Sequence, residues 1–298
     1  MNSFDSQRPS DPPEAETQTP PREQPAYAEP VSGSAGVDSP PETTAPARVP
    51  DLFRWRDLVI LLVFYLVVGA VFFQITLAAA SALLRTTPEA LQQSASAKVA
   101  VVAISQALLS GATLALLYLM VRSRPRPTPF WPALGWHAFP AAAPRAALAA
   151  RYMLAGAGLA IMIQAASYNL GPDFKVPMEE LFRDRPSVLM MMALGILVAP
   201  VLEETLFRGC IYPVIARTLG NPAGIVLTGT LFGLAHSLQL AGAWSQVALL
   251  SAVGIIFTYI RARTGTVVAS YFVHLGYNTF LFAVFYFVTG GLRNFPGP

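Results

Sequence analysis

The stretch LVILLVFYLVVGAVFFQITLAAASALL, residues 58–84, has 27 residues and no charged side chain. A helix needs about 20 consecutive apolar residues to cross the hydrocarbon core of a bilayer, which is roughly 30 Å thick. The stretch is therefore predicted to form a transmembrane helix. Five more uncharged runs follow it along the chain, at residues 99–121, 152–172, 186–202, 218–260 and 264–292.

Two of these runs need closer interpretation before the helices can be counted. The run 218–260 has 43 residues, which is enough for two spans, and the stretch 237–243, with its Ser, Gly and Ala residues, offers a place to turn. The run 186–202 is short, but its helix can continue past Glu203 and Glu204 to Arg217. The sequence thus predicts an all-α fold, a polytopic membrane helical bundle of about seven transmembrane helices.

The composition agrees with a membrane protein that carries a separate N-terminal tail. Of the 298 residues, 54% are hydrophobic and 12% are charged, whereas a soluble domain carries about 25% charged residues. Residues 1–50 hold 11 of the 26 prolines and few large apolar side chains, so we expect a disordered, proline-rich cytoplasmic tail. We expect transmembrane helices and an Arg-rich interfacial loop in residues 51–185, and a catalytic transmembrane core in residues 186–290.

The arginines between the apolar runs predict the orientation in the membrane. The segment 122–151 contains five arginines and no acidic residue, and Arg217 and the pair Arg261 and Arg263 mark two further basic turns. Basic loops tend to remain on the cytoplasmic side of a membrane. The tail and these three regions are therefore predicted to be cytoplasmic, which agrees with strict alternation of seven helices.

Residues 127–144 are uncharged, but they do not have the sequence of a membrane span. Five prolines, at positions 127, 129, 132, 140 and 144, would remove too many backbone hydrogen bonds from a spanning helix. The aromatic residues Phe130, Trp131, Trp136 and Phe139 suit the membrane interface. We expect a loop on the cytoplasmic face, either beside a substrate entrance or as a plain interfacial anchor.

Ionisable side chains are rare in the apolar C-terminal part of the chain. The last 114 residues contain only two acids, Glu203 and Glu204, and two of the three histidines, His236 and His274, lie in the long uncharged runs. Arg208 lies within an apolar helix rather than at its end. An ionisable group inside a membrane helix is costly and usually marks a functional site, so these five residues are the candidates for one.

The spacing of these residues indicates which of them lie on one helix face. Glu204 and Arg208 are four apart and can pair, whereas Glu203 points about 100° away from Glu204 and lacks that partner. His274 and Asn278 are also four apart. A carboxylate base, two imidazoles and an amide could activate water and stabilise an oxyanion. One carboxylate and two imidazoles could equally hold a divalent metal, and each residue alone could be structural.

Three short motifs contain these residues: APVLEETLFRGCIYP at 199–213, FGLAH at 232–236 and HLGYN at 274–278. In order and spacing they resemble the EExxxR, FxxxH and HxxxN motifs of the CAAX prenyl protease and bacteriocin-processing (CPBP) family of intramembrane endopeptidases. The resemblance covers about residues 186–290. Some members of that family remove the C-terminal tripeptide of prenylated CaaX proteins, and bacterial members are linked to bacteriocin maturation or self-immunity.

The resemblance implies a role for each motif residue of a catalytic site. Glu203 corresponds to the general base that acts on water. His236 would hold that water, or a metal, together with Glu203. His274 and Asn278 would lie near the oxyanion. Arg208 would hold the neighbouring carboxylate of the first motif in place.

That neighbouring carboxylate, Glu204, is the second acid of the first motif, so the resemblance and the spacing both separate it from the proposed base. Metal dependence is disputed in the family. Glu203, His236 and His274 could bind zinc as the metal ligands, although the HExxH spacing of soluble zinc proteases is absent from the sequence.

Small residues and a proline predict how the helices pack around this site. Gly229 and Gly233 form a GxxxG pair just before the second motif, which allows a neighbouring helix to approach closely. Pro200 would bend or open the helix that carries the first motif, or would begin a separate helix. The single cysteine, Cys210, is interpreted as a small packing residue.

Together these patterns predict a CAAX prenyl protease-like enzyme that hydrolyses a peptide bond near the cytoplasmic membrane face. We expect membrane lipid and a peptide or protein substrate, which could be C-terminally processed, as its partners, and no nucleic acid. The expected location is the inner (plasma) membrane of a prokaryote, with several spans and a cytoplasmic N-terminus. The alternatives are a non-enzymatic immunity or partner-binding protein and a proton-coupled transporter, although the sequence has no evident internal repeat.

Overall fold

The computed structural model describes residues 52–125, 128–139, 144–169, 184–240 and 243–293, and every regular element within these ranges is helical. The predicted tail, residues 1–50, lies outside the described residues. The first helices are α1 (Trp55–Leu84), α2 (Pro88–Gln93), α3 (Ala95–Arg122), α4 (Phe130–Ala133) and α5 (Arg145–Asn169). They are followed by α6 (Arg185–Ala193), η2 (Leu194–Val198), α7 (Ala199–Glu204), η3 (Thr205–Ile211), α8 (Tyr212–Leu219), α9 (Asn221–Ala235), α10 (Trp244–Thr264) and α11 (Val267–Val288).

The predicted all-α membrane bundle is confirmed. Six of the described helices are long and apolar enough to cross a membrane, namely α1, α3, α5, the continuous helix 185–219, α10 and α11. The seventh apolar helix, α9, has only 15 residues. The predicted turn in the run 218–260 is present, because α9 ends at Ala235 and α10 begins at Trp244. The described residues thus provide six full spans and one shorter apolar helix, where about seven spans were predicted.

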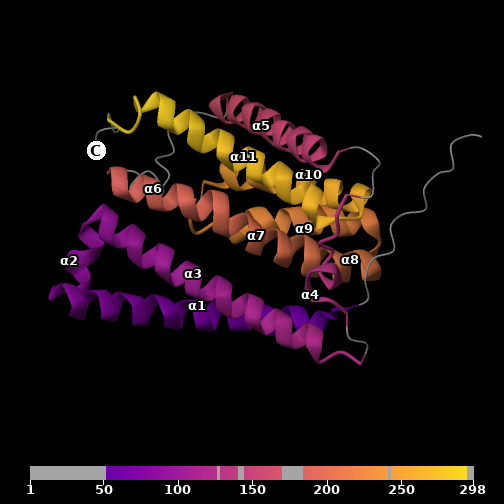
Figure 1. The fold of residues 1–298 in the computed structure, drawn as a ribbon, viewed down its shortest axis with the longest axis horizontal. Helices are drawn as coiled ribbons and strands as arrows, with labels where there is room; N and C mark the ends of the chain where they lie inside the picture. The colour runs from indigo at the N-terminus through magenta and orange to yellow at the C-terminus, as the bar shows by residue number, and fades with distance from the viewer. Residues whose placement is uncertain (1–51, 126–127, 140–143, 170–183, 241–242, 294–298) are drawn as a thin grey trace, which may run out of the picture. The chain divides into compact units, whose positions relative to one another are not determined.

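The described helices pack on the helix 185–219 or on one another (Figure 1). Helices α1 and α3 run side by side as a hairpin joined by α2, and α3 packs against α6. The helix 185–219 lies between this hairpin and α11, which packs along α5. Helices α9 and α10 pack on each other, and α9 also contacts α8. The first motif therefore lies on the central helix, between the hairpin and the C-terminal helices.

Polar contacts tie one end of the bundle together. Asp57, at the start of α1, accepts a hydrogen bond of 2.7 Å from the guanidinium of Arg124, which follows α3. The indole N–H of Trp55 donates to the Thr218 hydroxyl at the end of α8, over 3.2 Å. The predicted basic regions that follow α3 and end α8 thus meet at the same end of the bundle. Which side of the membrane this end faces stays a prediction.

The described part of the Pro-rich loop, residues 128–139, docks into this end of the bundle. It contains the single helical turn α4, after which Leu134 is fully buried. The amide of Val267 donates to the Gly135 carbonyl over 2.8 Å, and the indole N–H of Trp136 donates to the Thr205 hydroxyl over 3.1 Å. The predicted loop is thus anchored in the protein, directly beside the helix that carries the first motif.

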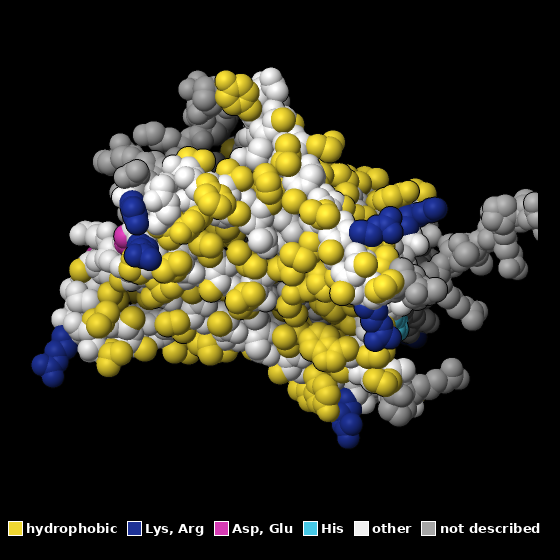
Figure 2. All heavy atoms as spheres, turned by 45° about the horizontal axis from the view of Figure 1, so that its top comes forward, with side chains coloured by type: hydrophobic (Ala, Val, Ile, Leu, Met, Phe, Trp, Pro, Cys, Tyr) yellow, Lys and Arg dark blue, Asp and Glu magenta, His cyan; other side chains and the backbone are white. Residues whose placement is uncertain are grey.

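The outer faces of the helices are apolar. Leu62 and Leu66 on α1 and Leu154 and Met162 on α5 are all more than half exposed. In Figure 2, hydrophobic side chains cover most of the visible face, and Lys and Arg side chains lie toward its ends. A soluble monomer rarely exposes a contiguous apolar area of this size. The protein is therefore a multi-pass membrane protein whose helices face lipid.

Candidate active site

The helix 185–219 changes its winding on both sides of the two glutamates. It is π-helical at Leu194–Val198 and again at Thr205–Ile211, and the α-helical turn Ala199–Glu204 lies between these segments. Pro200 lies within the continuous helix 185–219, in the first turn of its α-helical segment Ala199–Glu204 and directly after the first π-helical segment. Such π-helical turns occur frequently at functional sites.

Asn278 binds a backbone group that Pro200 leaves without a partner. In a π-helical turn the carbonyl of Gly195 would accept from the amide of residue 200, but proline has no N–H. The side-chain amide of Asn278 donates to this carbonyl over 2.7 Å. A side-chain amide has two N–H donors, so this contact engages one of them and fixes the position of the other.

Glu204 and Arg208 form the predicted pair, and both side chains are completely buried. Arg208 Nη1 lies 2.9 Å from Glu204 Oε1, and Nη2 donates to the Gly254 carbonyl over 2.9 Å. The guanidinium also lies over the rings of Phe232 and Phe257, at 4.7 and 5.3 Å from their centroids. A buried charge requires such partners, because its transfer out of water is otherwise very costly.

His274 connects the buried pair to Glu203. Its Nδ1 lies 3.0 Å from Glu204 Oε1, and its Nε2 lies 3.7 Å from Glu203 Oε2. With the Nδ1–H donating to the carboxylate, the ring orientation is fixed and Nε2 faces Glu203. The ring of Phe257 packs against the imidazole, 4.8 Å away between centroids. Glu204 therefore contacts His274 directly, and His274 is the residue that faces Glu203.

His236 approaches Glu203 from the other side. It lies just after the last residue of α9, and its Nδ1 is 2.7 Å from the Phe232 carbonyl. Its Nε2 lies 3.9 Å from Glu203 Oε1. Phe232 and His236 are four residues apart, and the centroids of their rings lie 4.9 Å from each other. The carbonyl contact fixes this imidazole too, so two ring nitrogens converge on one carboxylate.

Glu203 differs from its neighbour because it is accessible. Its side chain is 24% exposed, whereas that of Glu204 is 0% exposed. The distances of 3.7 and 3.9 Å to the two histidines exceed the length of a direct hydrogen bond. The Glu203 carboxylate therefore has no direct hydrogen bond to either histidine, and its oxygens remain available to water. The geometry is thus appropriate for a carboxylate that takes a proton from water.

The same three side chains are the predicted metal ligands, and their types suit zinc. A carboxylate behind a histidine, as Glu204 lies behind His274, also accompanies many metal sites. Within the described ranges, however, no group of three or more His, Cys, Asp or Glu side chains is arranged to hold a metal ion. Binding of zinc by Glu203, His236 and His274 therefore stays a prediction, and no step below is derived through a metal.

Close packing of α9 against α10 sets the position of the second motif. A Cβ atom at Gly229 would overlap Ile255, and one at Gly233 would overlap Ser251. The predicted close approach at the GxxxG pair is therefore correct. The neighbouring Gly254 is itself too close to Gly229 for a side chain, and this contact brings its carbonyl within reach of Arg208.

Comparison with known proteins agrees with the motifs. Residues 185–280 match the family described as type II CAAX prenyl endopeptidase Rce1-like. This part of the chain belongs to the CPBP family. All six predicted site residues lie within the matched range, and the membership expected from the three motifs is confirmed.

One relative also matches over part of its length. The chain is 28% identical over 131 residues to a Bacillus subtilis protein described as uncharacterized protein YyaK, an alignment that covers 41% of this chain and 42% of that protein. The match therefore spans less than half the length of that relative. No solved structure matches the chain significantly.

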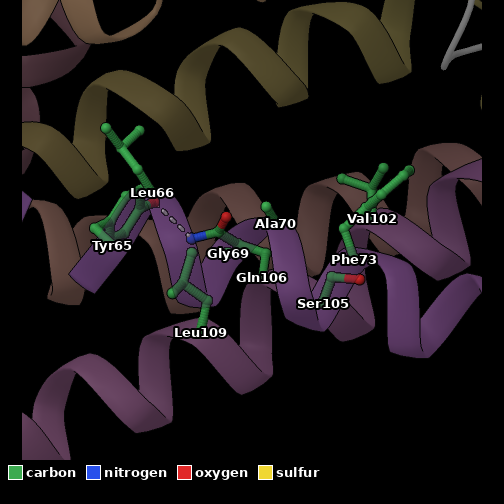
Figure 3. A pocket seen from close by; sticks show the side chains of 9 residues that line it. All are labelled: Tyr65, Leu66, Gly69, Ala70, Phe73, Val102, Ser105, Gln106 and Leu109. Atoms are coloured by element: carbon green, nitrogen blue, oxygen red, sulfur yellow. Dashed lines mark hydrogen bonds between the residues drawn. The ribbon is translucent and has the colours of Figure 1, made fainter. Parts of the chain in front are cut away.

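Two polar contacts involve residues that were not among the predicted site residues. One is the bond from Trp136 to Thr205, the residue directly after Glu204. The other joins Gln106 Nε2 to the hydroxyl of Tyr65, 3.2 Å apart (Figure 3). Gln106 has a signal in the sequence, since it is the only amide side chain in the run 99–121. The bond from Trp136 to Thr205 has no signal in the sequence, because it depends on the path of the loop that carries Trp136.

Proposed function

We propose that this protein is an intramembrane endopeptidase in which Glu203 activates water for hydrolysis of a peptide bond near the cytoplasmic membrane face. The observation that carries this proposal is the contrast between the partly exposed Glu203, which faces two imidazole nitrogens, and the completely buried Glu204. A general base must reach water, and it must lie near groups that position this water.

The first step is the attack of water on the carbonyl carbon of the substrate. His236 and Glu203 hold the water, and Glu203 takes one of its protons as the C–O bond forms. The carbonyl oxygen becomes an oxyanion, which the side chains of His274 and Asn278 stabilise. The remaining N–H of the Asn278 amide is the donor available for this, since the other is bound to Gly195.

The second step is the collapse of the tetrahedral intermediate. The oxyanion re-forms the carbonyl, the C–N bond breaks, and Glu203 returns its proton to the leaving amine. Each turnover therefore consumes one water and restores the carboxylate. Arg208 and Glu204 do not touch the substrate in this scheme. They keep His274 in its orientation, as the distances of 2.9 and 3.0 Å to Glu204 Oε1 indicate.

The substrate is proposed to be a membrane-associated peptide or protein that is cut near its C-terminus. The description of the matching family, a CAAX prenyl endopeptidase, supports this class without identifying the sequence cut. The proposed location is a prokaryotic inner membrane, with the end of the bundle that carries Arg124 and Arg217 in the cytoplasm.

The proposal is tested by terminal proteomics of cells that contain the wild-type protein, Glu203→Ala or His236→Ala. We expect new peptide termini in the wild type and their complete loss in both variants, at equal amounts of folded protein. Glu89→Ala is a matched control, because this carboxylate lies on α2, outside the motif region. Normal product formation by Glu203→Ala would contradict the mechanism. A cellular phenotype that survives in Glu203→Gln would instead indicate a partner-binding or immunity protein.

The metal question has a separate test on the purified enzyme. The peptide that spans the identified cut is incubated with enzyme treated with a chelator, and zinc is then added back. Activity that is lost and restored by zinc would establish a metal requirement, for which Glu203, His236 and His274 are the proposed ligands. Unchanged activity after treatment with the chelator would support the mechanism in which Glu203 acts on water without a metal.

A further inference from the structure

The α1–α3 hairpin carries a polar pair in its otherwise apolar middle. Gln106 Nε2 lies 3.2 Å from the Tyr65 hydroxyl, and both side chains are partly buried. The surrounding residues of α1, such as Leu62, Leu66 and Val67, are largely exposed and apolar. Polar groups at this depth in a membrane helix are rare and tend to be functional. The pair also lies outside the matched family region, which begins at residue 185.

The direction of the hydrogen bond leaves one donor unused. The Nε2 atom of Gln106 can only donate, so the Tyr65 oxygen is the acceptor. Within the part of the chain that the structure describes, the Tyr65 O–H has no acceptor of its own. A partly buried tyrosine hydroxyl usually finds a partner, and a substrate carbonyl would provide one.

The hairpin that carries this donor packs beside the helix of the proposed base. Helix α3 packs against α6 and against Leu194–Val198, the π-helical segment just before the first motif. The Tyr65 hydroxyl is near enough to the Glu203 carboxylate for the two to interact electrostatically. Tyr65 thus belongs to the hairpin that packs, through α3, beside the central helix.

A cavity lies beside the pair. Its volume is about 270 Å³, and Figure 3 shows Tyr65 and Gln106 with the other residues that line it, all from α1 and α3. Binding sites for whole drug-sized ligands have volumes of about 300–1,000 Å³, so this cavity suits a small part of a substrate. Its other walls include Leu66, Phe73 and Leu109, which suits an apolar side chain of the substrate.

We propose that Tyr65 is a further catalytic residue, whose hydroxyl donates a hydrogen bond to the oxygen of the scissile carbonyl as negative charge develops there. Gln106 is the positioning residue that holds this hydroxyl. The inference rests on the proposed function, and it adds a donor from the hairpin to those of the motif region. Tyrosine hydroxyls serve this purpose in several enzyme classes, because a preoriented donor stabilises the oxyanion more than the ground-state carbonyl.

The test is the cleavage kinetics of Tyr65→Phe in proteoliposomes, with the peptide that spans the Glu203-dependent cut as substrate. We expect kcat to fall about 100-fold, the usual effect of removing one oxyanion donor, while KM stays unchanged. Gln106→Leu keeps the hydroxyl but not its orientation, so its kcat should lie between those of Tyr65→Phe and the wild type. Thermal unfolding of each variant reports separately on its fold.

The chain offers matched controls for both substitutions. Tyr259 on α10 is 52% exposed, and Gln74 is exposed on α1, so Tyr259→Phe and Gln74→Leu should leave kcat unchanged. An unchanged kcat in Tyr65→Phe would overturn the inference, as would a raised KM with kcat preserved, which indicates substrate binding only. The proposed function fails by a different result, the absence of any Glu203-dependent product, and this inference would fail with it.

Discussion

The two sides of the helix 185–219 differ at adjacent residues. Glu204 is completely buried, and its Oε1 binds both Arg208 and His274. Glu203 is 24% exposed and has two histidine nitrogens at 3.7 and 3.9 Å. The first side has the properties of a structural support, because the carboxylate is held by direct hydrogen bonds and is not accessible to solvent. The second has the properties of a reaction site, because its carboxylate is accessible and has two imidazoles nearby without a direct hydrogen bond to either.

This difference shows how a membrane protein can keep two carboxylates close together in two different environments. A buried charge is tolerated only with partners, and here the buried carboxylate also fixes the imidazole of His274, which faces Glu203. The exposed carboxylate keeps its freedom to exchange protons. Substitutions on the two sides should therefore separate stability from activity.

The largest effect on stability is expected for Arg208→Met. The substitution leaves the Glu204 charge buried with one partner, and breaking a buried pair in this way costs about 3–5 kcal/mol. Unfolding of the purified protein in detergent should reveal this loss, together with loss of cleavage. The double variant Glu204→Gln/Arg208→Met should recover much of the stability, because no unpaired charge remains.

Arg263→Met is the matched control for this change. Arg263 is in the last turn of α10 and its side chain is exposed, so its removal should have little effect on unfolding. If Arg208→Met were as stable as Arg263→Met, the buried side of the helix would not be the support described above.

The sequence predicted the main features of both sides because charge is so rare in the body of the chain. Two acids in the last 114 residues are conspicuous, and a spacing of four predicts the pairing of Glu204 with Arg208. The turn between α9 and α10 was predictable for a similar reason, since a run of 43 uncharged residues is too long for one span.

Features that depend on tertiary contacts were not predictable in this way. The amide of Asn278 was expected near an oxyanion, and its bond to the Gly195 carbonyl depends on a π-helical turn 83 residues earlier in the chain. The docking of Trp136 on Thr205 requires the path of the whole loop. The partner of Gln106 is Tyr65, 41 residues away, and only the packing of the hairpin brings them together.

A smaller loss of stability is expected for Gly233→Leu. The side chain would collide with Ser251 and with the Val247 carbonyl on α10, and overpacking of this kind costs about 1–3 kcal/mol. Separation of the two helices would also shift His236, so cleavage should fall more than stability. Gly158→Leu is the control, because a Cβ atom there has nothing within 4 Å. Equal unfolding and equal cleavage by the two variants would show that close packing of α9 does not position the reaction site.

The smallest effect on stability is expected for Glu203→Gln. The substitution keeps the shape of the side chain, and Glu203 makes no direct hydrogen bond to either histidine, so the free energy of unfolding should change by no more than about 0.5 kcal/mol, as for a substitution outside packed contacts. Cleavage should nevertheless be lost, because an amide cannot take a proton from water.

Glu204→Gln is the natural comparison, since it removes the partner of Arg208 and should destabilise the protein strongly. Two isosteric changes at neighbouring residues would then give opposite results, one an inactive folded protein and the other an unstable one. Equal stability of the two variants would show that the different burial of Glu203 and Glu204 does not give them different structural roles.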